Sequence, residues 1–80
     1  MTEDEVYAGL TELLRDIFLR DDLVATPTLT ALEVAGWDSL RQIDIIIATE
    51  QRFGVKFSSR EIEELEDVGS LARTVLNKLG

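Results

Sequence analysis

An Asp-Ser pair stands at the predicted start of a helix, in the stretch GWDSLRQIDIIIATEQRFG at residues 36–54. Both residue types are common helix N-caps, and an isolated pair of this kind is usually only a cap. Since one residue caps a helix, Asp38 in that role leaves the Ser39 hydroxyl free in the first turn. Unpaired backbone N–H groups and the positive end of the helix dipole favour a negative group there. A phosphate ester on Ser39 would be well placed.

Other reactive chemistry has little support in this chain. It contains no histidine and no cysteine, which excludes Ser-His and Cys-His nucleophiles, disulfides and thiolate zinc sites. Paired carboxylates occur in REIEELED (60–67), but a solvated helix face explains that run more simply. RDD at 20–22 lacks the ligand spacing and the glycine of a calcium loop. We therefore expect neither an enzyme nor a metal site.

Length and charge narrow the class of protein further. Eighty residues, 45% of them hydrophobic and 30% charged, predict one globular domain spanning 1–80. No apolar run approaches the roughly 20 residues of a membrane span, and the start MTEDEVY is unlike a signal peptide, so we expect a cytoplasmic protein. Sixteen acidic and eight basic residues give a net charge of −8. That charge disfavours nucleic acid and anionic lipid, and favours either basic protein patches as partners or simple solubility.

Apolar periodicity predicts an all-α fold, a small bundle of three main helices and one short helix. Two capping boxes mark helix starts, Thr2 with Glu5 and Ser58 with Glu61. The predicted helices cover residues 3–20, 38–52 with a stop at Gly54, 59–65, and a last segment capped by Asp67.

A long loop is expected between the first two helices, at residues 21–36. The helical period is lost there, and Thr26-Pro27 disfavours helix locally. Apolar residues are nevertheless spaced through the loop, so it should pack on the bundle: Leu23, Leu29, Leu32 and Val34.

The second helix carries apolar residues around more of its circumference than one buried face requires. At about 100° per residue they form separate stripes: Leu40, Ile43 and Ile47; Ile46 and Phe53; and Ile45. Some of these side chains should face solvent or a partner, because an apolar patch beside charges is typical of a docking surface. The alternative is a central helix that buries most of itself, and core packing is the better expectation for each isoleucine taken alone.

Several segments share the spacing of one known family. DSL opens the second helix, alternating aliphatic and acidic positions follow, and the helix ends in EQRFG. A short third helix and DVGSLA at the start of the fourth complete the pattern. Across essentially its whole length, the chain resembles an acyl carrier protein.

The resemblance implies that Ser39 receives 4′-phosphopantetheine from coenzyme A, installed by a phosphopantetheinyl transferase. The thiol of this covalent arm would carry acyl groups as thioesters. Asp38 matches the family's preceding aspartate, associated with capping and with recognition by the transferase. Further matching positions would meet partner enzymes, with Arg41 beside them: Leu40, Asp44, Ile47 and Glu50. Others would line the core where relatives shelter an acyl chain: Ile46, Phe53, Ile62, Leu65, Ala72 and Val75.

The expected partners are acyl- or ketosynthase-type enzymes, acyltransferases or ligases with basic docking patches, met by a monomeric carrier. Arg41, Gln51 and Arg52 stand where carriers of fatty acid synthesis often have acids, so the charge of the second helix roughly cancels. Trp37 resembles stand-alone carriers of polyketide, modified-lipid or aminoacyl-transfer pathways, and its ring should anchor the loop. A specialised pathway is therefore expected. A peptidyl or aminoacyl carrier and an unmodified helical adaptor stay open as alternatives.

Overall fold

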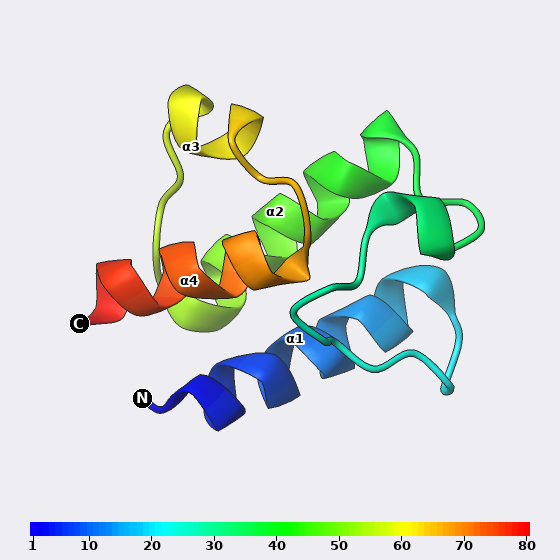
Figure 1. Cartoon of the computed structure of the whole chain (residues 1–80), viewed down its shortest axis with the longest axis horizontal. Coiled ribbons are helices and arrows are strands. Elements are labelled where there is room, and N and C mark those ends of the chain that lie inside the picture. Colours follow the sequence, from blue (N-terminus) through cyan, green and yellow to red (C-terminus); the bar gives the residue numbers. More distant parts are fainter.

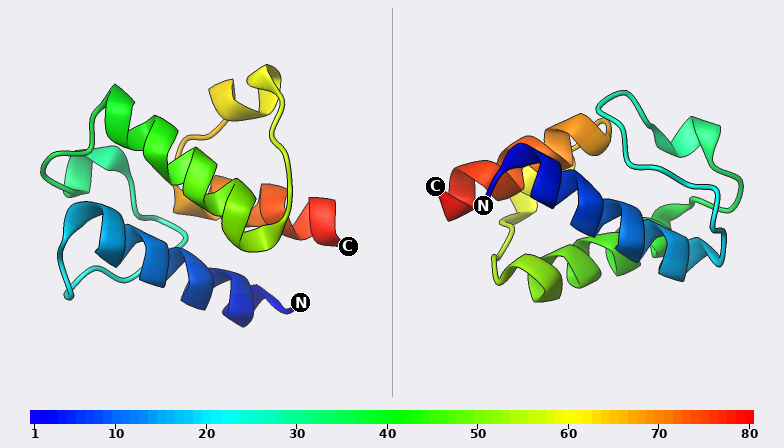
Figure 2. Two further views of the ribbon diagram at one scale, coloured as in Figure 1. Left: turned by 180° about the vertical axis from the view of Figure 1, so that it is seen from behind. Right: turned by 90° about the horizontal axis from the view of Figure 1, so that it is seen from below.

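The computed structural model describes all 80 residues, as helices and loops without strands. The helices are α1 (Glu3–Phe18), the 3-10 helix η1 (Ala31–Glu33), α2 (Ser39–Phe53), α3 (Ser59–Glu63) and α4 (Val68–Leu79). In Figure 1, α1 runs in one direction while α2 and α4 run in the other. From behind and from below, the two chain termini lie at the same end (Figure 2). The predicted all-α fold is confirmed. No helix is both long and apolar enough to span a membrane.

The predicted capping box opens α1. The Glu5 N–H donates to Thr2 Oγ1 over 3.2 Å, and Glu5 Oε1 accepts from the Thr2 N–H at 3.0 Å. The helix ends at Phe18, two residues before the predicted Arg20. Leu19 adopts a left-handed conformation with φ 55°, and the next N–H turns back to the Arg15 carbonyl at 3.1 Å. This turn stops the helix although the apolar period continues.

The core forms where α1 packs against both α2 and α4. Its buried side chains include Val6, Leu10 and Leu14 of α1, Ile45 and Phe53 of α2, and Val68, Leu71, Ala72 and Val75 of α4. A Cβ at Gly9 would lie 2.8 Å from Phe53 Cζ, so the glycine allows the end of α2 to approach α1 closely.

The long loop packs on the bundle, as its apolar residues predict, with one exception. Leu23 and Val34 are buried, and Leu29 is partly buried against the core. Leu32 is 98% exposed, so the prediction is wrong at that position. Leu32 is the middle residue of η1, and this tight turn directs its side chain to solvent while Val34 points inward.

Two backbone hydrogen bonds join the loop to the start of α4. The Val68 N–H donates to the Leu29 carbonyl at 2.9 Å, and the Gly69 N–H donates to the Pro27 carbonyl at 3.0 Å. Asp67 adds the predicted cap by accepting from the Ser70 N–H at 2.8 Å. The unpaired amides of the first turn are therefore satisfied by the loop as well as by the cap.

The short helix α3 starts as predicted and ends two residues early, at Glu63. The Glu61 N–H donates to Ser58 Oγ at 3.2 Å, and the Ser58 N–H donates to Glu61 Oε1 at 2.8 Å. The same carboxylate pairs with Lys78 of α4 at 2.8 Å. Glu61 therefore both caps α3 and connects it to the last helix.

We predict that Gly69→Ala destabilises the protein by about 1–3 kcal/mol, the usual effect of overpacking. The new Cβ would lie 2.6 Å from the Pro27 carbonyl oxygen, a backbone atom that cannot rotate away. Urea unfolding measures the loss. Asn77→Ala, at an exposed site of the same helix, is the control and should not lower stability. Equal stabilities for Gly69→Ala and wild type would contradict the tight contact.

The Asp67 cap also predicts a pH dependence. The Ser70 backbone N–H, and then its hydroxyl, hold the pKa of Asp67 below its ordinary 3.8. A carboxyl with a lowered folded-state pKa stabilises the fold above its unfolded pKa, and that contribution is lost as pH falls through the folded-state pKa. The stability difference between wild type and Asp67→Asn should therefore shrink on acidification below pH 3.8. Urea titrations at several pH values measure it, and a stability difference that does not change with pH would contradict this role of the Asp67 cap.

Candidate functional site

At the start of α2, one residue caps the helix and the next residue is exposed. Asp38 is the N-cap, and its Oδ1 accepts from the Arg41 N–H at 3.0 Å. Ser39 is the first helical residue and is exposed, and its hydroxyl makes no hydrogen bond within the chain. The geometry expected for Asp38 and Ser39 is confirmed. The serine oxygen is free to react, and the first-turn amides lie beside it.

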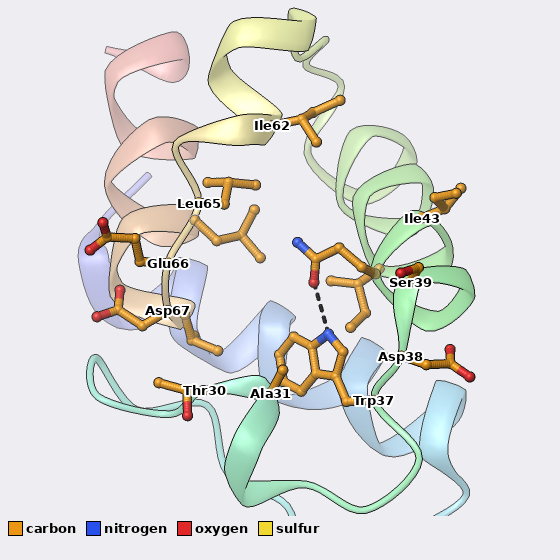
Figure 3. Close-up of a pocket in the computed structure, with 14 residues that line it drawn as sticks. Thr30, Ala31, Trp37, Asp38, Ser39, Ile43, Ile62, Leu65, Glu66 and Asp67 are labelled. Atoms are coloured by element: carbon orange, nitrogen blue, oxygen red, sulfur yellow. Dashed lines mark hydrogen bonds between the residues drawn. The ribbon is translucent and has the colours of Figure 1, made fainter.

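A cleft of about 590 Å³ opens beside Ser39. Ser39 and Ile43 border it from α2, while Leu65 and Asp67 stand across from them (Figure 3). Ile62 lies above and Trp37 and Ala31 below in the same view. Eight of the 14 lining residues are hydrophobic, so the cleft can accept an apolar group that enters next to Ser39.

The structure separates the six residues predicted to line the core in which an acyl chain would be sheltered. Ile62 and Leu65 border the cleft, but the other four do not. Phe53, Ala72 and Val75 belong to the closed core, and Ile46 is buried away from the cleft. The cleft is lined instead by apolar residues that the sequence did not predict for this role: Ile43, Ile45, Val68 and Leu71. DVGSLA marked the start of the last helix, yet nothing in its spacing indicates which side opens on a cleft.

Trp37 anchors the loop on two sides. Its ring lies 5.6 Å from the Phe18 ring, centroid to centroid, in a tilted arrangement. Its Nε1–H donates to Gln42 Oε1 over 2.8 Å, as the dashed line in Figure 3 shows. The anchoring expected for Trp37 is confirmed. Gln42 was absent from the sequence-based site, although its place three residues after Ser39 puts it on the same side of the helix.

The outward face of α2 is apolar. Leu40, Ile43 and Ile47 are 68%, 53% and 47% exposed, whereas Ile45 and Ile46 are buried. The expectation that some apolar residues of this helix face outward is confirmed. The prediction of core packing is wrong for Ile43 and Ile47, because the stripe that they share with Leu40 lies on the exposed side of α2.

Every charged side chain of α2 is engaged within the chain. Arg41 Nη1 lies 2.9 Å from Asp44 Oδ2, and Arg52 Nη2 lies 2.8 Å from Glu12 Oε2. Glu50 Oε2 accepts from the backbone N–H of residue 57 at 2.9 Å. The exposed ion pairs add little stability, but they leave the helix surface close to neutral beside its apolar stripe.

Comparison with known proteins places this geometry in a family. Residues 8–75 match the family model described as phosphopantetheine attachment site. The chain belongs to this family of acyl carrier proteins. The solution NMR structure of the holo acyl carrier protein from Geobacter metallireducens is similar, with a TM-score of 0.87 and 34% identity over 92% of this chain and 85% of that one.

Curated relatives are similar over nearly the whole chain. The meromycolate extension acyl carrier protein of Mycobacterium leprae is 28% identical over 99% of this chain and 68% of its own length. The acyl carrier protein of Acidothermus cellulolyticus is 23% identical over 96% of this chain and 92% of its own. Acyl carrier proteins are generally not enzymes themselves and interact with synthases and transferases.

The cofactor of this acyl carrier protein is covalently attached phosphopantetheine. The start of α2 fits such a group, because an exposed hydroxyl without a hydrogen-bond partner lies there at the amide end of the helix. The neighbouring cleft offers apolar surface to whatever the group carries.

Proposed function

We propose that Ser39 is the attachment residue and that the protein carries acyl groups between enzymes without catalysing a reaction. The observation that carries the proposal is the exposed, unbonded hydroxyl in the first turn of α2, beside an apolar cleft. Asp38 supports this role by occupying the cap, because a Ser39 hydroxyl bonded to the backbone would be less available. When bound, phosphopantetheine supplies the terminal thiol that this cysteine-free chain lacks.

The chain's own groups suit an anion on Ser39. The first amides of α2 and the positive end of its dipole would stabilise the charge of the phosphodiester. Asp38 lies in the cap, and its carboxylate is directed to the Arg41 N–H. We propose that it positions the helix start for the transferase.

The cleft is the proposed shelter for an acyl chain. Ile62 and Leu65 from the predicted set would contact it, together with Ile43 of α2 and Leu71 of α4. The other four predicted residues would support the walls from the core: Ile46, Phe53, Ala72 and Val75.

The proposed partners are a phosphopantetheinyl transferase and the acyl- or ketosynthase-type enzymes, acyltransferases or ligases that load and unload the carrier. Leu40 and Ile47 would contact them directly, and the paired Arg41 and Asp44 would border that contact. The net charge of −8 would steer the carrier toward basic patches. Glu50 would act less directly, because its carboxylate already holds a loop amide. The monomeric state and the cytoplasmic location stay predictions.

A specialised lipid pathway is the proposed setting. Relatives named for meromycolate extension support this assignment, and so do Arg41 and Trp37, which depart from the pattern of fatty acid synthesis. The carrier would serve enzymes that modify or extend acyl chains of that class.

We predict that incubation with coenzyme A and a broad-specificity phosphopantetheinyl transferase adds one phosphopantetheine to the wild type and none to Ser39→Ala. Intact-protein mass spectrometry measures the gain. Ser59→Ala is a matched control, because Ser59 is the exposed first residue of α3 just as Ser39 is of α2. It should be modified like the wild type. A folded wild type that never gains mass would favour an unmodified helical adaptor.

For the docking surface, we predict that Ile47→Ala lowers kcat/KM of the transferase reaction about three- to tenfold, the usual effect of truncating a central interface residue. Leu32→Ala is the control, because Leu32 is 98% exposed but lies outside α2, and it should change kcat/KM less than about twofold. The mass of the product follows the reaction. A loss of less than about twofold for Ile47→Ala would exclude the apolar stripe as the docking surface.

A further inference from the structure

Gln42 brings a polar group with a fixed orientation into the apolar cleft. An indole N–H can only donate, so the atom that accepts from Trp37 at 2.8 Å must be the amide oxygen Oε1. This contact settles the orientation of the amide, which its shape alone leaves ambiguous. The Nε2 group is therefore on the other branch. It makes no hydrogen bond within the chain and is not a buried atom, so its two N–H donors are accessible to water.

The lining of the cleft offers few hydrogen-bond acceptors to Gln42 Nε2. The residues that line the cleft with Gln42 include Ile43, Ile45, Leu65 and Leu71. Two of the three acidic groups on the rim have partners of their own, since Asp67 accepts from the Ser70 N–H and Asp38 from the Arg41 N–H. The carboxylate of the third, Glu66, is directed away from the cleft (Figure 3). An apolar ligand would remove water from Gln42 Nε2 without replacing its hydrogen bonds, which is unfavourable. A ligand with an acceptor oxygen beside Nε2 would replace them.

We propose that Gln42 Nε2 binds a carbonyl oxygen of the molecule that enters the cleft from Ser39. The inference rests on the proposed function of Ser39 and adds a polar contact point to its cleft. Gln42 lies one helical turn from Ser39 on the same side of α2, so a chain attached to the serine passes it on the way inward. An amide carbonyl of the arm and an oxo group near the thioester of the cargo share this chemistry.

The sequence makes a direct test possible, because it has three primary amide side chains, Gln42, Gln51 and Asn77. Proton–nitrogen NMR spectra would be recorded on the apo and phosphopantetheine forms and on forms loaded from octanoyl- and 3-oxooctanoyl-coenzyme A. Intact mass confirms each loading, and Gln42→Met assigns the signal. We expect one Gln42 amide proton to move downfield on loading, while the exposed Gln51 amide stays in place.

Hydroxylamine cleavage of the thioester gives a second readout. Gln42→Met should speed cleavage about fivefold relative to wild type, the factor expected for one lost hydrogen bond. Gln51→Met is the matched control and should cleave like the wild type. Trp37→Phe keeps an aromatic ring near Phe18 but removes the N–H that orients the amide, so it should reduce the Gln42 shift. Urea unfolding verifies that each variant is folded.

The two acyl forms distinguish the two candidate oxygens. A Gln42 shift and a rate change in both forms would identify an amide carbonyl of the phosphopantetheine arm. Changes confined to the 3-oxo form would identify the oxo group of the cargo, and either result supports the proposal. A carrier that is loaded by mass but shows no Gln42 shift and no rate change would overturn this inference alone. The absence of any mass gain on wild type would overturn the proposed function as well.

Discussion

The two hydrogen bonds between the long loop and the start of α4 fix the position of the loop that borders the cleft. They tie Pro27 and Leu29 to the first turn of α4, at the point where an added Cβ on Gly69 would meet a backbone oxygen. With the loop held there, Thr30 and Ala31 form one border of the cleft. The loop then continues to Trp37 and the start of α2. A loop without this attachment would leave both the cleft and the position of Ser39 poorly defined.

Much of this architecture follows from local sequence. Capping residues at Thr2, Asp38, Ser58 and Asp67 act over three or four positions, so each helix start was predictable. Helix ends were less so, because the left-handed turn at Leu19 is made by a residue that rarely adopts it. Sequence spacing also predicted that α2 has two apolar sides, but not which side faces the core.

The candidate site was predictable only at Ser39, the proposed attachment residue, and at its neighbour Asp38. Ser39 and Asp38 are neighbours, so their division of roles can be deduced from one helix turn. The cleft is built by contacts between segments far apart in the chain, and apolar periodicity carries no information on which core positions open outward. Sequence spacing did not predict a role for Gln42 for the same reason. That role depends on a contact with Trp37 from the preceding loop.

Trp37 has a further consequence, because it is the single tryptophan of the chain and stands in the wall of the cleft. Its indole is partly shielded, contacts Phe18 and donates to Gln42. Tryptophan emission from this protein therefore originates at one known place. The molecule has a built-in optical reporter beside its cleft, and a change in the contents of that cleft alters the surroundings of the fluorophore without any added label.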